Sequence, residues 1–416
     1  MSDTLMVRLD SLVDVDPENL PATTPSHFSF NYIDISAVSE GRIDLPPNEV
    51  TFSVAPSRAR RVIRTDDVLM ATVRPNLKAF SKCDLPSGNF VASTGFAVLR
   101  SKAETDPRFI LAAILSDDVG RQIESMAVGS NYPAINTPDV RRLSIPALLP
   151  GEQLRIGVIL GTVEDCIRKT DALIAKYQQI KAGLMHDLFT RGLMSDGHLR
   201  PPSKEASQLY KDSPLGLIPN EWAVRSFSEL VNIERGYAFH SEDYREDGML
   251  NFRVSNVGML PGDLDNTQYL PRKFWDEYPS QQLFGGEIVI VMVGATTGKV
   301  GRVPVEICPS LLNQNLWHLN PGPEITRDFL WYSLSGIVGR HMRMSQGSAR
   351  DFLKQSDFGR TPILFIGKEE QAAISSILTE TDNRLLRESQ TKEKLVLEKR
   401  GLMQALLSGQ TSSGEL

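Results

Sequence analysis

Cysteine is scarce in this sequence, and no metal-binding spacing accompanies it. The three cysteines lie far apart and never form a Cys-x-x-Cys pair: Cys83, Cys166 and Cys308. An odd, dispersed set argues against a disulfide framework, and the missing paired spacing argues against a structural zinc site. We therefore expect no metal in this chain and a reducing, cytoplasmic environment.

Long hydrophobic runs are also missing. No stretch approaches the roughly 20 apolar residues that a membrane helix needs. The segment from Met1 to Asp10 carries acidic residues and has no apolar core of the kind that a signal peptide requires. We expect a protein without a membrane segment.

Motifs that would indicate catalysis are absent or incomplete. The stretch from Gly294 to Lys299 has three residues between its glycines and Val300 after its lysine, whereas a phosphate-binding loop needs four residues and then Ser or Thr. A methyltransferase would need a Gly-rich cofactor loop and an Asn/Asp-Pro-Pro-aromatic tetrapeptide, and neither occurs. Pro138-Asp139 is not followed by the acidic-x-Lys triplet of a nuclease, and the histidines are dispersed. We expect a non-catalytic chain.

The sequence also has no excess of positive charge. The formal net charge is -6, so any surface that binds nucleic acid must be local rather than general. One dense basic cluster exists, formed by Arg58, Arg60, Arg61 and Arg64. The sequence leaves two interpretations of this cluster open, a phosphate-binding patch and a solvated edge.

What the chain does contain is an internal repeat. Glu152-Gln153 recurs as Glu370-Gln371, and Gly183-Leu184-Met185 recurs as Gly401-Leu402-Met403, both 218 residues later. A chain of 416 residues exceeds what one hydrophobic core usually serves. The repeat and the length together predict two copies of one unit.

Each copy ends in a segment with the heptad pattern of a coiled coil. In the first copy Thr170 and Lys181 interrupt a seam of apolar residues, which are Ile156, Leu160, Val163, Ile167, Ile174, Tyr177, Leu184 and Leu188. The second copy places Glu388 and Lys392 on its seam, whose apolar members are Ile374, Leu378, Leu385, Leu395, Leu402 and Leu406. We expect the middle of this second helix to pack less tightly.

A lone helix of this length would leave its apolar stripe in water, so we expect the two helices to pair within the chain. An antiparallel pairing would carry the two globular domains to opposite ends of the helices and relate them by a pseudo-twofold axis. The predicted fold class is α+β, with two globular domains separated by two long antiparallel coiled-coil helices.

The expected domain organisation follows from these boundaries. Short β-branched runs such as Asp67–Val73 and Glu287–Val293 indicate strands, and Phe109–Leu115 and Phe329–Leu334 indicate helices. The predicted segments are a first globular domain at 1–150, a first long helix at 151–192, a linker at 193–220, a second globular domain at 221–367, a second long helix at 368–410 and a tail at 411–416.

Three stretches carry a resemblance to a known family. They are Ile145–Gln153, Gly183–Gly192 and Ile218–Trp222, in that order along the chain. With the repeat, they resemble the specificity subunit of type I restriction-modification systems over essentially the whole chain. The chain departs from the family pattern in two places. The first domain lacks the Ile-Pro-x-x-Trp lead that precedes the second, and Phe365–Gln371 lacks the second proline of Ile145–Gln153.

The resemblance implies a function and a set of partners. It implies two target recognition domains that each read half of a bipartite sequence in double-stranded DNA, with the helices setting the gap. It also implies docking of two modification (methyltransferase) subunits and, through them, restriction subunits. Adenine methylation and ATP-driven cleavage would belong to those partners, with S-adenosylmethionine, ATP and Mg²⁺; no cofactor is expected in this chain.

Polar loop residues are the candidates for DNA contact, because base edges are read by side chains with bidentate or adaptable hydrogen bonding. In the first domain they are Arg74, Asn76, Lys78, Ser130, Asn131 and Tyr132, and in the second they are Thr296, Thr297, Lys299, Ser348, Arg350 and Lys354. Each of these residues could instead be part of an ordinary polar turn. The alternative function is a non-catalytic scaffold whose helices and domains bind protein partners.

Overall fold

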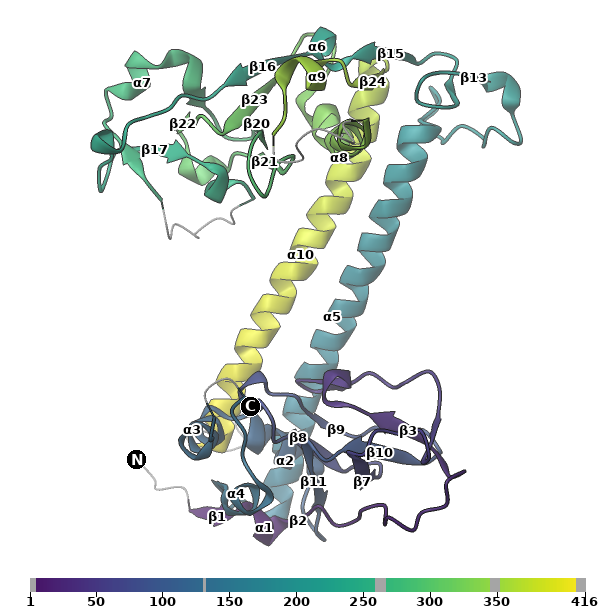
Figure 1. Cartoon of the computed structure of the whole chain (residues 1–416), viewed down its shortest axis with the longest axis vertical. Helices are drawn as coiled ribbons and strands as arrows, with labels where there is room; N and C mark the ends of the chain where they lie inside the picture. The colour runs from purple at the N-terminus through teal and green to yellow at the C-terminus, as the bar shows by residue number, and fades with distance from the viewer. Residues whose placement is uncertain (1–4, 130–131, 259–266, 345–351, 409–416) are drawn as a thin grey trace. The chain divides into compact units, whose positions relative to one another are not determined.

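The computed structural model describes residues 5–129, 132–258, 267–344 and 352–408, and it divides the chain into two compact units. Unit 1 is Met1–Ile174 with Arg387–Leu416, and unit 2 is Ala175–Leu386. Two helices of 41 and 40 residues contribute to both units, α5 (Pro150–Thr190) and α10 (Lys368–Leu407) (Figure 1).

Unit 1 contains two four-stranded sheets and two short strand pairs. The first sheet is antiparallel and has the order β2 (Val13–Val15), β11 (Phe96–Ser101), β8 (Val68–Ala71), β9 (Phe80–Lys82). The second has the order β6 (Val50–Thr51), β3 (Ser29–Ile33), β10 (Phe90–Ser93), β7 (Ala59–Ile63). The pairs are β1 (Met6–Arg8) with β12 (Ser144–Pro146) and β4 (Val38–Ser39) with β5 (Arg42–Ile43).

Short helices complete unit 1. They are α1 (Leu9–Leu12), α2 (Pro107–Leu115), α3 (Asp117–Met126) and α4 (Thr137–Arg142), with single turns η1 (Ile35–Ala37) and η2 (Pro75–Leu77). Ser116 separates α2 from α3, because its side chain caps the second helix by accepting a hydrogen bond from the Val119 amide.

Unit 2 repeats the same strand arrangement. One sheet has the order β16 (Val231–Arg235), β23 (Leu316–Pro321), β20 (Ile288–Val291), β21 (Val300–Arg302). The other has the order β18 (Tyr269–Leu270), β17 (Met249–Phe252), β22 (Ser310–Leu312), β19 (Gln282–Leu283). The pairs are β15 (Ala223–Ser226) with β24 (Pro362–Phe365) and β13 (Tyr210–Lys211) with β14 (Ile218–Pro219).

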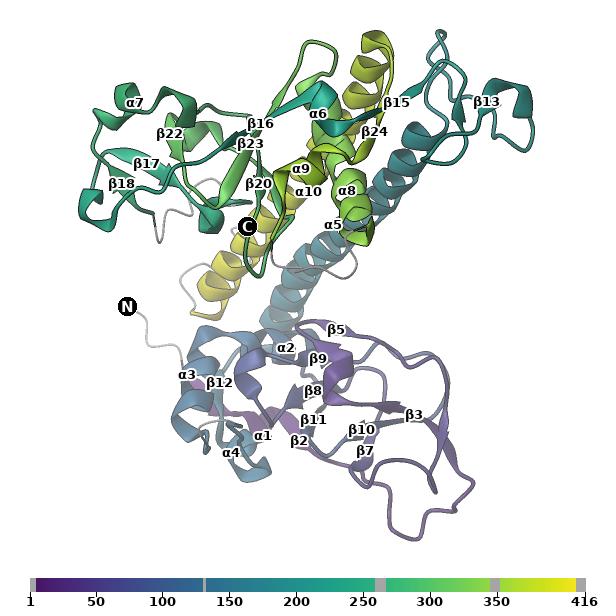
Figure 2. The same ribbon diagram turned by 45° about the horizontal axis from the view of Figure 1, so that its top comes forward.

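The helices of unit 2 lie beside these sheets. They are α6 (Phe227–Leu230), α7 (Phe274–Glu277), α8 (Arg327–Met344) and α9 (Gln355–Gly359), with turns η3 (Ser207–Leu209), η4 (Ser241–Asp243), η5 (Val254–Asn256), η6 (Pro279–Gln281) and η7 (Val305–Ile307). Both views show α8 beside the part of α10 that belongs to this unit (Figure 2).

The duplication is visible in the topology of the two units. Each has a pair of strands that opens and closes the globular part, an antiparallel four-stranded sheet, and a second sheet with one parallel pair, β3 with β10 and β17 with β22. One difference is that α2 and α3 of unit 1 correspond to the single helix α8 of unit 2. The predicted α+β class with an internal repeat is confirmed.

The hydrophobic core of each unit includes residues from both long helices. In unit 1, Ile156 and Leu160 of α5 join Met403 and Leu406 of α10 in the cluster that contains the sheet residues. In unit 2, Leu188 of α5 joins Ile374 and Leu378 of α10. Each globular part is therefore built on the helices rather than merely connected to them.

The predicted coiled-coil seam is also confirmed. On α5 its apolar members are buried or half-buried along the whole helix, and Thr170 is buried because its hydroxyl donates to the Cys166 carbonyl at 2.9 Å. On α10, Ile374, Leu378 and Leu406 are buried, whereas Glu388 and Lys392 are only half-buried. The seam is thus looser at its middle than at its ends.

Ion pairs join α5 and α10 in both units, and the two pairs of unit 1 show that the helices run antiparallel. In unit 1, Glu164 lies 2.6 Å from Lys399 and Asp171 lies 2.7 Å from Lys392. In unit 2, Lys181 lies 2.5 Å from Asp382. No helix within the described ranges is long and apolar enough to cross a membrane.

Candidate nucleic-acid interface

The described candidates of unit 1 lie on one turn, which carries Arg74, Asn76 and Lys78, and on one loop, which carries Tyr132. The turn joins β8 to β9 and places Arg74 and Lys78 on either side of η2. Arg74 has φ +50° and ψ +51°, and Lys78 has φ +51° and ψ +37°, so both are left-handed. This conformation costs a non-glycine residue about 1 kcal/mol, and such strain concentrates at functional sites.

A second loop docks on this turn and supports it. The Arg74 amide donates to the Pro133 carbonyl at 2.7 Å, and Val73 forms a bridge with Ala134. The Arg74 guanidinium carbon lies 4.3 Å from the centre of the Tyr132 ring. Because 66% of Tyr132 is exposed, the structure brings Arg74 and Tyr132 together as a stacked pair at the surface.

The other two candidates of the turn differ in their surroundings. Asn76 is exposed at the tip of the turn. Lys78 points back toward the fold, where its ammonium donates to the Leu115 carbonyl at 3.1 Å, at the C-terminus of α2. A cation is favourable there because the helix dipole is negative at that end, so Lys78 has a structural role that the sequence did not reveal.

The corresponding turn of unit 2 joins β20 to β21 and contains Thr296, Thr297 and Lys299. Glycines occupy its two positive-φ positions, Gly294 at +99° and Gly298 at +85°. The Thr297 hydroxyl donates to the Gly294 carbonyl at 2.6 Å, so it closes the turn internally. Thr296 and Lys299 are exposed.

A segment from the end of the globular part supports this turn too. Val293 forms a bridge with Phe352, and the Leu353 amide donates to the Met292 carbonyl at 2.7 Å. Lys354, which follows directly, is exposed just before α9. The structure therefore brings Lys354 to the same surface as the β20–β21 turn.

The remaining candidates of the sequence analysis, Ser130, Asn131, Ser348 and Arg350, lie outside the described residues. Two apolar residues were missed by the search for polar side chains. Leu77 is 65% exposed at the tip of the first turn, and Val128 is 78% exposed in the loop that supports it. No signal in the sequence distinguishes them from core residues, because exposure at a turn depends on the tertiary fold.

Three of the four arginines in the basic cluster of unit 1 pair with acidic neighbours. Arg58 lies 3.0 Å from Asp34, Arg61 lies 2.9 Å from Asp16 and Arg64 lies 2.6 Å from Glu18. The fourth member, Arg60, lies over the ring of Phe52 with its guanidinium carbon 4.7 Å from the ring centre. These pairings favour the solvated edge over a phosphate-binding patch.

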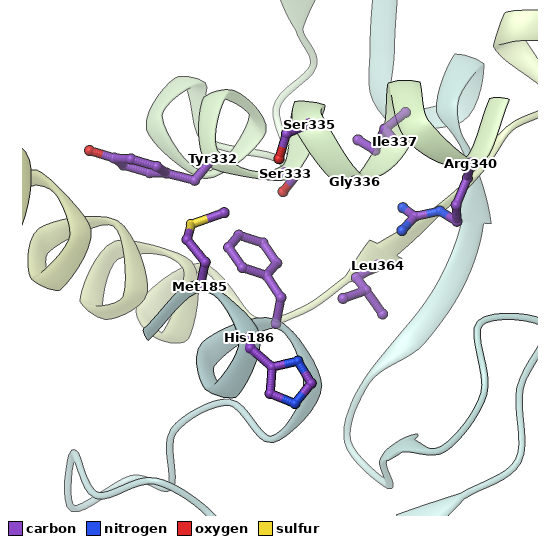
Figure 3. Close-up of a pocket in the computed structure, with 10 residues that line it drawn as sticks. Met185, His186, Tyr332, Ser333, Ser335, Gly336, Ile337, Arg340 and Leu364 are labelled. Atoms are coloured by element: carbon purple, nitrogen blue, oxygen red, sulfur yellow. The ribbon is translucent and has the colours of Figure 1, made fainter. Parts of the chain in front are cut away.

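Unit 2 also has a pocket of about 250 Å³ between α5 and α8. Figure 3 shows the Tyr332 and Arg340 side chains on α8 and Met185 and His186 on α5. Burial raises the pKa of Tyr332 to about 12, so its phenol stays protonated and donates to Asp382 at 3.0 Å. The lining residues include no carboxylate and no cysteine.

The described residues hold no group of three or more His, Cys, Asp or Glu that could bind a metal.

The fold and these surfaces define a class of protein with a duplicated α+β unit, each copy carrying an exposed turn supported by a late loop of the same copy. Comparison with protein families matches residues 219–397 to the type I restriction modification DNA specificity domain. The matched segment contains the second globular part and most of α10.

Curated relatives agree with this match. The type I restriction enzyme MjaVIII specificity subunit of Methanocaldococcus jannaschii is 25% identical over 304 residues, which are 69% of this chain and 66% of the relative. The putative type I restriction enzyme MjaX specificity subunit of the same organism is 23% identical over 72% of this chain and 66% of the relative. The alignments thus span slightly less than two thirds of each relative's length.

Solved structures share the fold over nearly the whole chain. The type I restriction-modification system S subunit from M. genitalium is 18% identical, covers 98% of this chain and 97% of its own, and has a TM-score of 0.63. A chain from a study of complex assembly and conformational transition of the type I R-M system is 24% identical over 97% of both chains, with a TM-score of 0.56. The chain is therefore similar to type I restriction enzyme specificity subunits in sequence, and the matched specificity domain lies in its second half.

Proposed function

We propose that this chain is the DNA sequence-specificity subunit of a type I restriction-modification complex. It would recognise a bipartite target in double-stranded DNA and direct adenine methylation and restriction by partner subunits. The observation that carries this proposal is the exposed turn that occurs once in each unit, after β8 and after β20, in a chain that matches the specificity domain over residues 219–397. Two different turns on one duplicated fold suit a target with two different halves.

The proposed contacts combine two kinds of side chain. Lysines neutralise phosphates and provide affinity, whereas arginine, asparagine, threonine and tyrosine reach base edges and provide specificity. The proposed contact set is Arg74, Asn76, Lys78, Ser130, Asn131, Tyr132, Thr296, Thr297, Lys299, Ser348, Arg350 and Lys354. The described members of this set that are exposed are Arg74, Asn76, Tyr132, Thr296, Lys299 and Lys354.

The proposed domains keep the boundaries that the sequence predicts. Residues 1–150 and 221–367 form the two target recognition domains, and 151–192 and 368–410 form the conserved helices. The segment 193–220 connects the first helix to the second recognition domain, and 411–416 is a tail. Bounds of α5 and α10 support the helical assignments, since they lie within two or three residues of these limits.

The chemistry is proposed to belong to partner subunits in the cytoplasm. Two modification subunits would bring S-adenosylmethionine, and restriction subunits that join through them would bring ATP and Mg²⁺. This chain would contribute no catalytic residue and no cofactor, and it would position the others on the DNA.

Modification subunits would dock on the outward faces of the long helices. Leu173 and Ile180 of α5 are each more than 40% exposed, and Leu386 and Leu397 of α10 are 57% and 70% exposed. Leu173 and Ile180 are seven residues apart and therefore share one face of α5, and apolar residues grouped on one exposed face suit an interaction surface. The single exposed cysteine of the described residues, Cys166, lies on α5 and provides a probe.

Thiol labelling tests this docking surface. We expect a maleimide to modify Cys166 in the chain alone and to react more slowly after the modification subunit is added. The variant Cys166→Ser identifies the labelled site. Equal labelling rates with and without the modification subunit, in a mixture that co-elutes on gel filtration, would place the docking surface elsewhere.

Single-molecule sequencing for N6-methyladenine tests the function itself. The comparison is between cells that express this chain with its modification subunit and cells that lack only this chain. We expect a bipartite methylated motif that disappears with the chain. Unchanged methylation, together with no binding of the purified complex to a library of random duplexes, would favour a scaffold that binds protein partners.

A further inference from the structure

The β8–β9 and β20–β21 turns share two positive-φ positions and differ in chemistry. Each follows a buried strand, each is bridged to a late loop through Val73 or Val293, and each has two positive-φ positions. Unit 2 fills those positions with Gly294 and Gly298, which tolerate them freely, whereas unit 1 fills them with Arg74 and Lys78. Unit 1 therefore keeps two side chains at positions where glycine would fit the backbone better.

The fold accounts for one of these side chains. The Lys78 ammonium donates to the Leu115 carbonyl at the end of α2 and lies 3.9 Å from Asp117, so it ties the turn to a helix. This contact compensates for the strained backbone at Lys78.

The fold does not account for Arg74 in the same way. Among the residues that the structure describes, its guanidinium has no hydrogen-bond or ion-pair partner, and its one contact of note is the exposed ring of Tyr132. The hydrogen bond to Pro133 uses the backbone amide and would be made by any residue but proline. An exposed stacking contact contributes little to stability, so the strain at Arg74 points to a role outside the fold.

The chemistry of that role follows from the stacked geometry. A guanidinium that lies over an aromatic ring keeps its planar set of N–H donors free, and stacking limits the orientations that it adopts. Such a fork matches the O6 and N7 acceptors of guanine in the major groove. Exposed Asn76 and Leu77 flank it, so the tip of the turn offers both polar and apolar contacts to a groove.

We propose that Arg74, stacked on Tyr132, reads a guanine in the half-site bound by unit 1, and that unit 2, with Gly294 at this position, reads its half-site without such an arginine. The inference rests on the proposed function. It assigns a base-reading role to Arg74 and a positioning role to Tyr132 and Lys78.

The test compares four variants of the full chain in complex with its modification subunits. Arg74→Ala removes the guanidinium and keeps the strained backbone, whereas Arg74→Gly removes both. Arg74→Lys keeps the positive charge but lacks the planar set of N–H donors. Arg42→Ala removes another exposed arginine of unit 1, one that pairs with Asp44. Competition binding at fixed salt measures each complex against the target duplex and against duplexes substituted at every base pair of both halves.

We expect the wild-type complex and Arg42→Ala to discriminate at a guanine of the first half. All three Arg74 variants should lose roughly five- to a hundredfold of discrimination at that one position and keep discrimination throughout the second half. Arg74→Gly should also melt at a higher temperature than Arg74→Ala, because glycine relieves the strained backbone.

Three results would overturn the inference while the proposed function stands. Unchanged discrimination in every Arg74 variant would remove Arg74 from the reading set. An equal loss of affinity for all duplexes would assign Arg74 to a phosphate instead of a base. A lower melting temperature for Arg74→Gly than for Arg74→Ala would show that the backbone is not strained. If the wild-type complex itself discriminates at no position, the proposed function fails, and the inference fails with it.

Discussion

The carboxylate of Glu370 accepts a hydrogen bond from the guanidinium of Arg200 at 2.6 Å, and both side chains are nearly buried. The same carboxylate accepts from the Trp222 indole at 3.0 Å and from the Leu193 amide at 2.7 Å. Glu370 thus joins the first turn of α10 to the segment that follows α5 and to the start of the second globular part. The backbone at Gly192 has φ +64°, and a Cβ there would collide with Trp222 and Glu370.

Glu370→Ala should destabilise the chain by about 3 kcal/mol, because it leaves Arg200 as a buried charge without its main partner. The matched control is Glu152→Ala, at the equivalent position of the repeat. Glu152 is exposed and accepts only from the Leu149 amide at 2.9 Å, so we expect a loss of about 1 kcal/mol. Urea unfolding measures both changes, and equal losses would contradict this assignment.

The repeated glutamine has the same role in both units. Gln153 donates to the Leu148 carbonyl at 2.8 Å and accepts from the Asp106 amide before α2. Gln371 donates to the Ile366 carbonyl at 2.9 Å and accepts from the Thr326 amide before α8. Each glutamine therefore connects a long helix to the chain that precedes it and to the start of a second helix.

Substituting either glutamine should weaken its own unit. We expect Gln371→Ala and Gln153→Ala each to lower the free energy of unfolding by about 1–3 kcal/mol, because buried amide and carbonyl groups lose their partners. Gln208→Ala is the control, since this glutamine is exposed. Hydrogen exchange should show faster opening at α8 for the first variant and at α2 for the second. Opening that is the same in both variants would exclude separate local roles.

Periodicity revealed the long helices because their burial follows the seam. Ile156, Leu160 and Ile167 are buried at the predicted spacing, and the β-branched runs Asp67–Val73 and Glu287–Val293 contain β8 and β20. These features depend on local patterns of a few residues, which a sequence carries directly. The recognition of the repeat followed from them.

Tertiary roles could not be read in the same way. The sequence presents Glu152 and Glu370 as equivalent, but only Glu370 meets Arg200 and Trp222, which the folded linker brings to it. That linker contains the strand pair β13–β14, which no periodic pattern in the sequence indicated. The left-handed backbone of Arg74 was equally hidden, because no pattern marks a non-glycine residue at such a position.

The stability of unit 2 should depend on pH through His341. Burial lowers the pKa of this histidine from its ordinary value of 6.5, while Asp357 opposes the shift, and its Nδ1 lies 3.1 Å from the Thr361 hydroxyl. The unfolded chain therefore binds the proton more readily than the folded one. The stability that depends on neutral His341 should be fully present above pH 6.5. The free energy of unfolding should fall as the pH drops below this value, by at most about 1.4 kcal/mol per pH unit.

Thermal melts between pH 7.5 and 5.5 would measure this dependence. We expect His341→Asn to be less stable at pH 7.5 and to lose less further stability on acidification than the wild type. His240→Asn, at an exposed position of the same unit, should keep the wild-type profile. A wild-type profile in His341→Asn would assign the acid sensitivity to other groups.

The antiparallel pairing of the long helices can be tested by exchanging charges across it. Lys181→Glu should bring a second carboxylate next to Asp382, and Asp382→Lys should bring a second ammonium next to Lys181. Both side chains are about one-third exposed, so solvent screening limits each loss to roughly 1 kcal/mol. Asp382 also accepts from the Tyr332 phenol, which makes its substitution the more harmful of the two.

The double variant Lys181→Glu with Asp382→Lys should recover part of the stability that the single variants lose, because it restores an opposite-charge pair. The exchange of Lys392 and Asp171 repeats the test in unit 1, where the two side chains lie 2.7 Å apart. Urea unfolding of the single and double variants gives the coupling energy, which we expect to be about 0.5–1 kcal/mol and stabilising. Strictly additive losses in both units would contradict the pairing of α5 with α10 in this register, since only neighbouring charges can compensate for one another.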